Sequence, residues 1–237
     1  MESEVNQPST ASTSRPRRVR SFVRRGGRLT TAQARAIEQL WPRFGIEFAP
    51  QPLDLDVIFG RRATRLLEIG FGNGDTLLSI ARERADWDCL GIEVHEPGVG
   101  RVLLQAQEFA LRNVRVICHD AVEVLEQQIA DESFDEVLVF FPDPWPKKRH
   151  HKRRLIQPAF MSLLARKLKH TGALRLATDW QPYAEQMLAV LNACELLVNG
   201  VADRTFAPRP AIRPVTRFER RGQRLGHAVW DLDYRRK

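Results

Sequence analysis

The segment of the chain best equipped for chemistry is residues 140–154, with the sequence FFPDPWPKKRHHKRR. A single acid, Asp143, lies between two prolines and is followed by a tryptophan, a third proline, six Lys or Arg residues and two His residues. Prolines restrict the backbone and would hold the acid rigidly where the preceding apolar run ends. The adjacent cations could bind nucleic-acid phosphates through salt-dependent, sequence-independent contacts. A merely solvated charged surface would need neither the prolines nor the tryptophan.

A second group of candidate residues surrounds the glycine-rich turn at residues 67–75, LEIGFGNGD. Gly70 and Gly72 stand where an apolar run gives way to a helical pattern, and glycine permits positive φ and close approach of a ligand. The G-x-G-x-G spacing differs from the G-x-G-x-x-G of dinucleotide sites, and Glu68 and Asp75 would repel a pyrophosphate. Flanking acids favour a ligand that carries an ammonium and a sulfonium group instead.

Two later apolar runs also lead into acids. Glu93 ends one run and could accept hydrogen bonds from both hydroxyls of a ribose. Asp120 follows another run and could accept from an adenine amino group. Because parallel strands end at the same edge of a sheet, these acids and Glu68 would surround one pocket. Each acid alone could equally cap a helix or lie in a solvated loop, whereas all three together with the glycines favour a binding site.

The elements that must position these residues alternate along the chain. Short apolar runs are typical of buried parallel strands, and helical patterns lie between them. This alternation predicts an α/β fold with a doubly wound, mostly parallel sheet, and residues 228–234 could add a late antiparallel strand. Thr30 or Thr31 could cap a short helix through Leu40 that Pro42 would end. The predicted strands are 66–70, 89–94, 114–118, 136–141 and 173–178, and the predicted helices include 97–109 and 155–168.

The charge distribution suggests two ligands of opposite sign. The chain of 237 residues has a net charge of +8, and an excess of Lys and Arg fits a polyanionic partner. Residues 66–143 carry 16 acids and 5 bases, a balance of −11, whereas the remainder carries 32 bases and 13 acids, a balance of +19. We expect a disordered or flexible basic arm over residues 1–35 and a single domain over residues 36–237.

Other features limit the possible classes of protein. No apolar stretch is long enough to span a membrane, and the N-terminal charges are not followed by the apolar run of a secretory signal. Cys89, Cys118 and Cys194 lack C-x-x-C spacing, so we expect buried thiols in the reducing cytoplasm. His150 and His151 have no Cys or acid partner at metal-binding spacing, so we expect no metal site.

These motifs resemble the bacterial tRNA (guanine-N7)-methyltransferases, a family of class I methyltransferases with a Rossmann-like fold. The resemblance extends from about residue 17 onward and rests on residues 67–72, 91–95, 141–150, 177–180 and 216–219. The proline-rich motif is the most specific of these. The resemblance implies transfer of a methyl group from S-adenosylmethionine to N7 of a guanine in the variable loop of tRNA.

The residues and the resemblance together give one set of site assignments. The cofactor-binding set comprises Glu68, Gly70, Gly72, Glu93, Asp120 and Asp143, and Asp143 is also the candidate catalytic residue. The substrate-binding set comprises Lys147, Asp179, Thr216, Arg217, Phe218 and Glu219. The RNA-contact set comprises Arg149, His150, His151, Lys152, Arg153 and Arg154.

Several alternatives stay open from the residues alone. Asp179 could cap a helix that begins after Trp180, and Thr216 and Glu219 could be strand-edge residues. An N6-adenine or protein methyltransferase is an alternative, but it would prefer an Asn-Pro-Pro-Tyr or Asp-Pro-Pro-Tyr loop. A non-catalytic RNA-binding module of the same fold is a further alternative, which the cofactor acids and Asp143 disfavour. The sequence does not distinguish a monomer from a homodimer.

Overall fold

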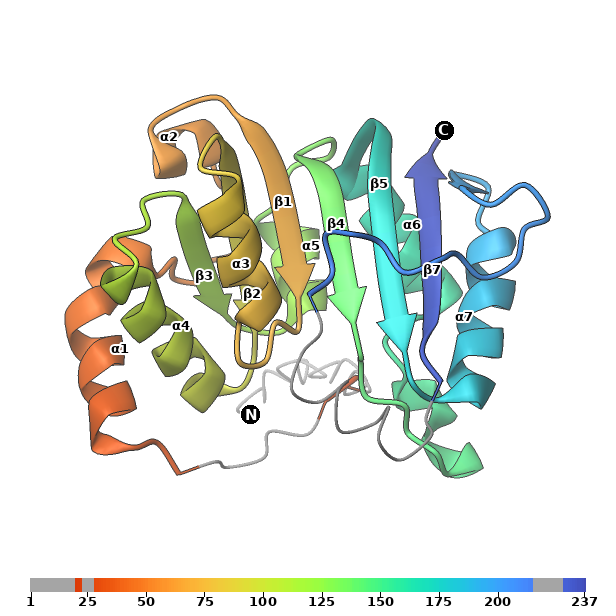
Figure 1. Cartoon of the computed structure of the whole chain (residues 1–237), viewed down its shortest axis with the longest axis horizontal. Helices are drawn as coiled ribbons and strands as arrows, with labels where there is room; N and C mark the ends of the chain where they lie inside the picture. Colours follow the sequence, from red (N-terminus) through yellow and green to blue (C-terminus); the bar gives the residue numbers. More distant parts are fainter. Residues whose placement is uncertain (1–19, 23–27, 215–227) are drawn as a thin grey trace, which may run out of the picture.

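The computed structural model describes residues 20–22, 28–214 and 228–237. Its centre is a seven-stranded sheet with the order β3-β2-β1-β4-β5-β7-β6. The strands are β1 (Thr64–Ile69), β2 (Trp87–Glu93), β3 (Val114–Cys118), β4 (Phe134–Phe140), β5 (Leu168–Thr178), β6 (Leu197–Asn199) and β7 (Trp230–Arg236). The parallel strands end at the lower edge of the sheet, whereas β7 runs the opposite way (Figure 1).

The five predicted parallel strands and the late antiparallel strand are confirmed. The parallel strands form because most of their side chains are apolar and helices cover both faces of the sheet, and β2 is buried from Asp88 to Glu93. The antiparallel strand β7 pairs with β5 on one side and with β6 on the other. Strand β6 was not predicted, because its three residues form too short a pattern to recognise.

Helices cover both faces of this sheet, with α3 and α4 in front of it and α5 and α6 behind it (Figure 1). One apolar core includes side chains of α1, α3 and α4, and a second includes side chains of α5, α6 and α7. Within the described ranges, no helix has both the length and the apolar character needed to cross a bilayer. The helices are α1 (Thr31–Phe44), α2 (Leu55–Phe59), α3 (Asp75–Glu83), α4 (Glu96–Glu108), α5 (Ala121–Gln127), η1 (Lys148–Arg153), α6 (Pro158–Lys167) and α7 (Gln181–Asn192).

Two helix boundaries differ from the predictions. Thr30 caps α1 through a capping box with Gln33, as expected, but Pro42 lies inside the helix, which continues to Phe44. The proline falls in the last turn, where the missing N–H removes only one bond, and the fully buried Phe44 side chain holds that turn against the core. Helix α6 starts at Pro158 and not at residue 155, because proline suits the first turn of a helix but not its interior.

Candidate functional site

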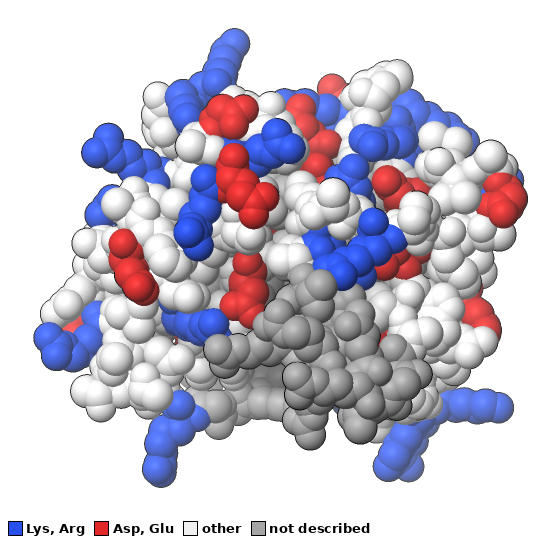
Figure 2. Space-filling view, in the orientation of Figure 1, with Lys and Arg blue, Asp and Glu red and all other residues white. Residues whose placement is uncertain are grey.

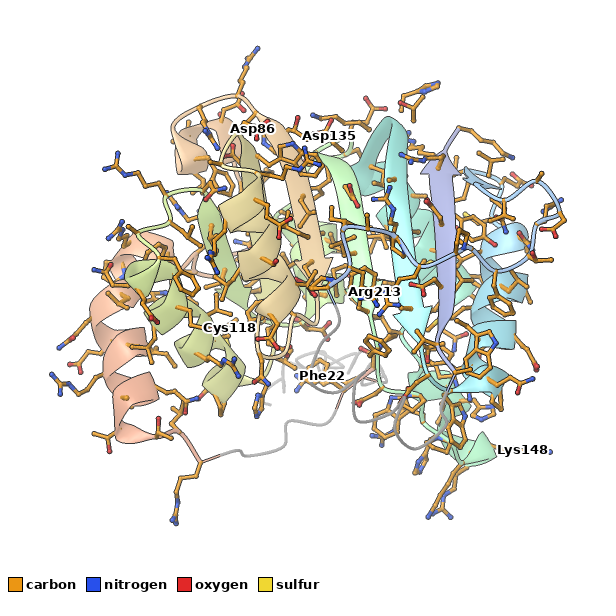
Figure 3. All side chains as sticks on the ribbon, in the orientation of Figure 1. Phe22, Asp86, Cys118, Asp135, Lys148 and Arg213 are labelled. Carbon is orange, nitrogen blue, oxygen red and sulfur yellow. The ribbon has the colours of Figure 1, made fainter. Side chains whose placement is uncertain are left out.

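A cavity of about 290 Å³ lies where the parallel strands end. Its wall comes from the loops after β1, β2, β3 and β4, as expected for a ligand site at the carboxyl edge of such a sheet. Figure 3 places Phe22, one of the lining residues, beneath this edge. The lining residues are Ser21, Phe22, Ile69, Gly70, Ile92, Glu93, Val94, His95, His119, Asp120, Ala121, Phe140, Phe141, Pro142, Asp143 and Leu155.

The carboxylate of Glu93 organises the glycine turn. One oxygen accepts from the backbone N–H of Gly72 at 2.8 Å, and the other accepts from Val94 and His95 at 2.6 and 3.0 Å. The φ of Gly72 is +54°, a conformation that favours glycine. A side chain at Gly98 would meet the carbonyl oxygen of Gly72 at 2.1 Å, so α4 must approach this turn closely. Glu93 therefore fixes the backbone around the cavity and also contributes to its wall.

Asp120 has two functions in the structure. It lines the cavity, and one of its oxygens caps α5 by accepting from the backbone N–H of Val122 at 2.9 Å. The helix-cap alternative is thus correct for this residue, yet the cap does not remove it from the cavity wall. The neighbouring His119 stacks on Phe48, with ring centroids 3.7 Å apart, and pairs with Glu123 at 2.5 Å.

Glu68 is buried within the sheet, and the residues that follow it, Ile69 and Gly70, line the cavity. Its Oε2 atom has no hydrogen-bond partner. Burial raises the pKa of Glu68 from 4.5 to about 8, a backbone hydrogen bond from Leu77 opposes this rise, and the charges of Glu93 and Asp75 add to it. The charged form of a buried acid with an unsatisfied oxygen is destabilising, because that form lacks a counter-ion.

This burial predicts a pH-dependent cost to stability. The folded protein holds the Glu68 proton up to about pH 8, whereas the unfolded chain releases it above its ordinary value of 4.5. Stability from this group is therefore present below 4.5 and is lost as pH rises towards 8. We expect Glu68→Gln to raise the free energy of unfolding at about pH 8.5 by one to a few kcal/mol, with little change at about pH 5. Urea unfolding at both pH values would measure this difference, with the exposed Glu83→Gln as the matched control. An equal shift at both values would contradict the prediction.

The loop after β4 carries Asp143 at the mouth of the cavity. The side chain is exposed, lines the cavity and has no hydrogen-bond or ion-pair partner among the described residues. Two non-glycine residues with positive φ flank it, Phe141 at +52° and Trp145 at +43°. Such conformations cost free energy and persist only where the surrounding structure enforces them. The loop backbone therefore holds the Asp143 carboxylate in a defined position, where it is available to a ligand.

The basic run that follows folds as the short helix η1, at the lower right corner of the molecule. Cationic side chains project into solvent there, and Lys148 points away from the protein (Figures 2 and 3). Arg149 and Lys152 are exposed, while the guanidinium of Arg153 lies 5.0 Å from the ring centre of Trp145. Partial desolvation and the surrounding cations lower the pKa of His150 below its ordinary value. The surface of η1 is thus available for an anion.

Arg154 does not share this exposed surface, which corrects its assignment as an RNA contact. Only 3% of the residue is exposed. Its Nε atom donates to the carbonyl oxygen of Pro144 at 2.9 Å, and its Nη1 atom donates to Gln186. The guanidinium also lies 4.8 Å from the ring centre of Tyr183. A side chain held in this way cannot reach a phosphate without leaving its contacts.

Two of the predicted substrate-binding residues, Lys147 and Asp179, lie outside the cavity wall. Lys147 is exposed and immediately precedes η1. Asp179 follows β5 and has no hydrogen-bond partner among the described residues. It does not cap α7, because the N-cap position belongs to Trp180, whose N–H donates to Thr178 Oγ1 at 3.3 Å. The remaining substrate-binding predictions, Thr216, Arg217, Phe218 and Glu219, fall outside the described residues.

Sequence reasoning missed the contribution of Ser21 and Phe22 to the cavity wall. The carbonyl oxygen of Ser21 accepts from the indole N–H of Trp145 at 3.0 Å, which joins the N-terminal segment to the loop of Asp143. The Arg-rich sequence around these residues gives no sign of this contact.

Across residues 20–22, 28–214 and 228–237, no group of three or more His, Cys, Asp or Glu side chains is arranged to hold a metal ion.

Known proteins provide an independent comparison. Residues 62–232 match a family model described as "Putative methyltransferase". A tRNA (guanine-N(7)-)-methyltransferase of Paraburkholderia xenovorans (strain LB400) is 60% identical over 221 residues, which cover 93% of this chain and 84% of that protein. A protein of the same name from Leifsonia xyli subsp. xyli (strain CTCB07) is 58% identical over 218 residues, covering 92% and 96% of the two chains.

Solved structures support the fold. The crystal structure of the aminoglycoside resistance methyltransferase NpmB1 aligns with a TM-score of 0.52 and 16% identity, covering 77% of this chain and 92% of that chain. At this identity the likeness concerns the architecture alone. The strand order with an antiparallel β7 beside β5 is accordingly that of a Rossmann-like class I methyltransferase.

Proposed function

This chain belongs to the tRNA (guanine-N(7)-)-methyltransferase family, and we propose that it methylates N7 of a guanine in the variable loop of tRNA. The methyl donor is S-adenosylmethionine. One observation carries the proposal for the site, namely the exposed carboxylate of Asp143, which lies at the cavity mouth beside the basic helix η1. A carboxylate suits a purine that gains positive charge, and a basic surface suits the RNA around it.

The residues around the cavity fit this cofactor. Carboxylates from three strands stand where a ligand with an ammonium group and ribose hydroxyls would meet them. The Oε2 atom of Glu68 lacks a partner in its buried position and could receive a cation. When bound, S-adenosylmethionine supplies the methyl group as an electrophile. We propose that Glu93 and Asp120 hold its ribose and adenine. We also propose that the positive charge of the bound cofactor lowers the pKa of Glu68, so that this side chain releases its proton and compensates the charge.

The chemistry of N7 determines what the protein must supply. This atom has an in-plane lone pair and carries no hydrogen, so its methylation needs no general base. The protein must position the purine and place an anion near its developing charge. We propose that Asp143 does both, because its oxygens can accept hydrogen bonds from guanine N1–H and the amino group. Adenine lacks this pair of donors and would bind less well. We propose that Asp179, at the end of β5, assists Asp143 in positioning the guanine.

The RNA-contact proposal is revised to the residues of the loop that are exposed or partly exposed. Lys147, Arg149, Lys152 and Arg153 would hold phosphates, with His150 and His151 as polar neighbours. Arg154 is excluded because it is buried. Phosphate contacts position the RNA without reading its sequence, so guanine selection falls to Asp143 and not to the basic helix.

A charge-matched comparison tests this surface. We expect simultaneous Arg149→Gln, Lys152→Gln and Arg153→Gln to weaken tRNA binding and to reduce the log–log salt slope by roughly one to three. The control removes three cations from the opposite edge of the sheet, Arg62, Arg84 and Arg112, each of which closely precedes a parallel strand. Filter binding at several salt concentrations measures the tRNA affinity and the salt slope of both triple variants. Equal effects of the two triple variants would contradict a contact specific to η1.

The proposed activity is tested by product identification. The protein is incubated with labelled S-adenosylmethionine and unmodified tRNA, and the RNA is digested to nucleosides. We expect the label in 7-methylguanosine. Label in N6-methyladenosine, or in the protein itself, would support the alternative methyltransferase classes. Binding of tRNA without any methyl transfer would support the non-catalytic alternative.

A further inference from the structure

We propose that Arg154 is a positioning residue that fixes the loop of Asp143 against helix α7, so that phosphate contacts on η1 and the catalytic carboxylate move as one unit. The inference rests on the proposed function and extends it to a residue whose buried position excludes direct contact with RNA. It concerns how the site is held in place, since Arg154 does not line the cavity.

The guanidinium of Arg154 joins two separate parts of the chain. Its Nε atom donates to the carbonyl oxygen of Pro144, the residue next to Asp143, at 2.9 Å. Its Nη1 atom donates to Gln186 Oε1 on α7, and its plane lies over the Tyr183 ring at 4.8 Å. One planar group therefore ties the loop backbone to the helix through two hydrogen bonds and a ring contact.

Helix α7 is a firm support for this contact. The Tyr183 side chain is fully buried, and its hydroxyl accepts from the backbone N–H of Ile156 at 3.1 Å. Gln186 donates to the carbonyl oxygen of Ile156 at 3.2 Å. Burial raises the pKa of Tyr183, so its hydroxyl stays neutral. The same two side chains thus hold both Arg154 and the backbone that leads into α6.

The buried surroundings of Arg154 would destabilise the fold without compensation if this side chain served only to fill space. The side chain has no carboxylate partner among the described residues, and its buried Nη2 atom has no hydrogen-bond partner. A buried charge without a counter-ion disfavours folding, and an apolar side chain of similar volume would serve packing at lower cost. The directional bond to Pro144 is what an apolar side chain could not supply.

The position of Arg154 in the chain connects it to RNA binding. It immediately follows η1, which ends at Arg153, and its side chain returns to Pro144 before η1 begins. The hydrogen bond between Arg154 and Pro144 therefore closes a loop that contains the cations of η1. Asp143 immediately precedes this loop. Trp145 within this loop keeps a φ of +43°, which requires such external restraint.

The test separates positioning from charge and from binding. We expect Arg154→Met to lower the single-turnover rate of methyl transfer about tenfold or more, because small misplacements of a catalytic group are expensive. Affinities for tRNA and for S-adenosylhomocysteine should stay within about twofold, since neither ligand touches Arg154. Arg154→Lys should recover little of the rate, because an ammonium lacks the planar fork that reaches Pro144 and Gln186 together. The matched control is Arg166→Met, at the end of α6 and half-exposed, which should leave the rate unchanged.

Hydrogen exchange provides a readout that does not depend on activity. We expect faster exchange over residues 142–154 in Arg154→Met and an unchanged rate over β1 and β2. If Arg154→Met fails to fold, Gln186→Met removes one accepting oxygen of the same link and should slow transfer while keeping both affinities. A normal rate in a folded variant, full rescue by lysine, or a loss confined to tRNA affinity would each overturn the proposal. If the wild-type protein does not methylate guanine N7, the proposed function fails, whereas the exchange experiment still decides whether Arg154 holds the loop.

Discussion

Asp143→Asn should lower the turnover number by 10²-fold or more, on the order of magnitude found when preorganised electrostatic stabilisation is removed. The variant keeps the shape of the side chain but loses its charge and half of its acceptor capacity. Its amide would also direct a donor at the guanine donors. The fold should be unaffected, because Asp143 is exposed and has no partner among the described residues. Single-turnover assays at saturating tRNA and cofactor measure the rate, with thermal unfolding as the check on stability.

The matched control is Asp86→Asn, an exposed aspartate at the opposite edge of the sheet (Figure 3), which should leave the rate unchanged. The pH profile separates an anion from a base. Because no proton leaves N7, the single-turnover rate of the wild type should stay level across neutral pH. A bell-shaped profile governed by a base near pH 7 would contradict this mechanism. So would activity near that of the wild type in Asp143→Asn.

The second large effect is expected at Glu93. Glu93→Ala removes three backbone hydrogen bonds around the glycine turn together with the proposed ribose contact. At about 1–3 kcal/mol for each charged hydrogen bond, we expect cofactor affinity to fall by about 10²-fold or more. The isosteric Glu93→Gln should lose less cofactor affinity, because its side-chain carbonyl oxygen can still accept from Gly72 or from Val94 and His95. Calorimetric titration with S-adenosylhomocysteine measures both variants.

Glu108→Ala, at the exposed end of α4, is the control for loss of an acid and should bind the cofactor normally. The binding result separates two roles of Glu93. If affinity were unchanged in Glu93→Ala, neither the turn nor the ribose contact would depend on this residue, and the cofactor assignment would be wrong. A loss of affinity accompanied by a collapse of stability would instead show that the backbone role dominates.

The parallel strands could be predicted because each one is recognisable from a short, continuous stretch of the sequence. Residues 114–118 are apolar except for Arg115, and a short, mostly apolar run of this kind is typical of a covered parallel sheet. The acids at the strand ends followed from the same topology, since parallel strands deliver their last residues to one edge. Glu93 and Asp120 accordingly line the cavity, and Asp143 lies at its mouth.

The remaining features depend on contacts between distant parts of the chain. A run of six cations does not reveal that Arg154 folds inward, because its partners Tyr183 and Gln186 come from a later helix. The cap formed by Asp120 and the contact of Ser21 with Trp145 are likewise set by three-dimensional neighbours. Pro42 stays within α1 because tertiary burial of the last turn outweighs the local cost of proline.

The most direct measurement compares two tRNA transcripts that differ at a single atom per guanine. One contains guanosine and the other contains 7-deazaguanosine, in which a C–H group replaces N7 while the N1–H and amino donors remain. We expect methyl incorporation only into the guanosine transcript. The 7-deaza transcript should still bind and compete, because Asp143 and η1 recognise groups that it retains. Methyl incorporation into the 7-deaza transcript would contradict methylation at N7, since the accepting atom could not then be N7.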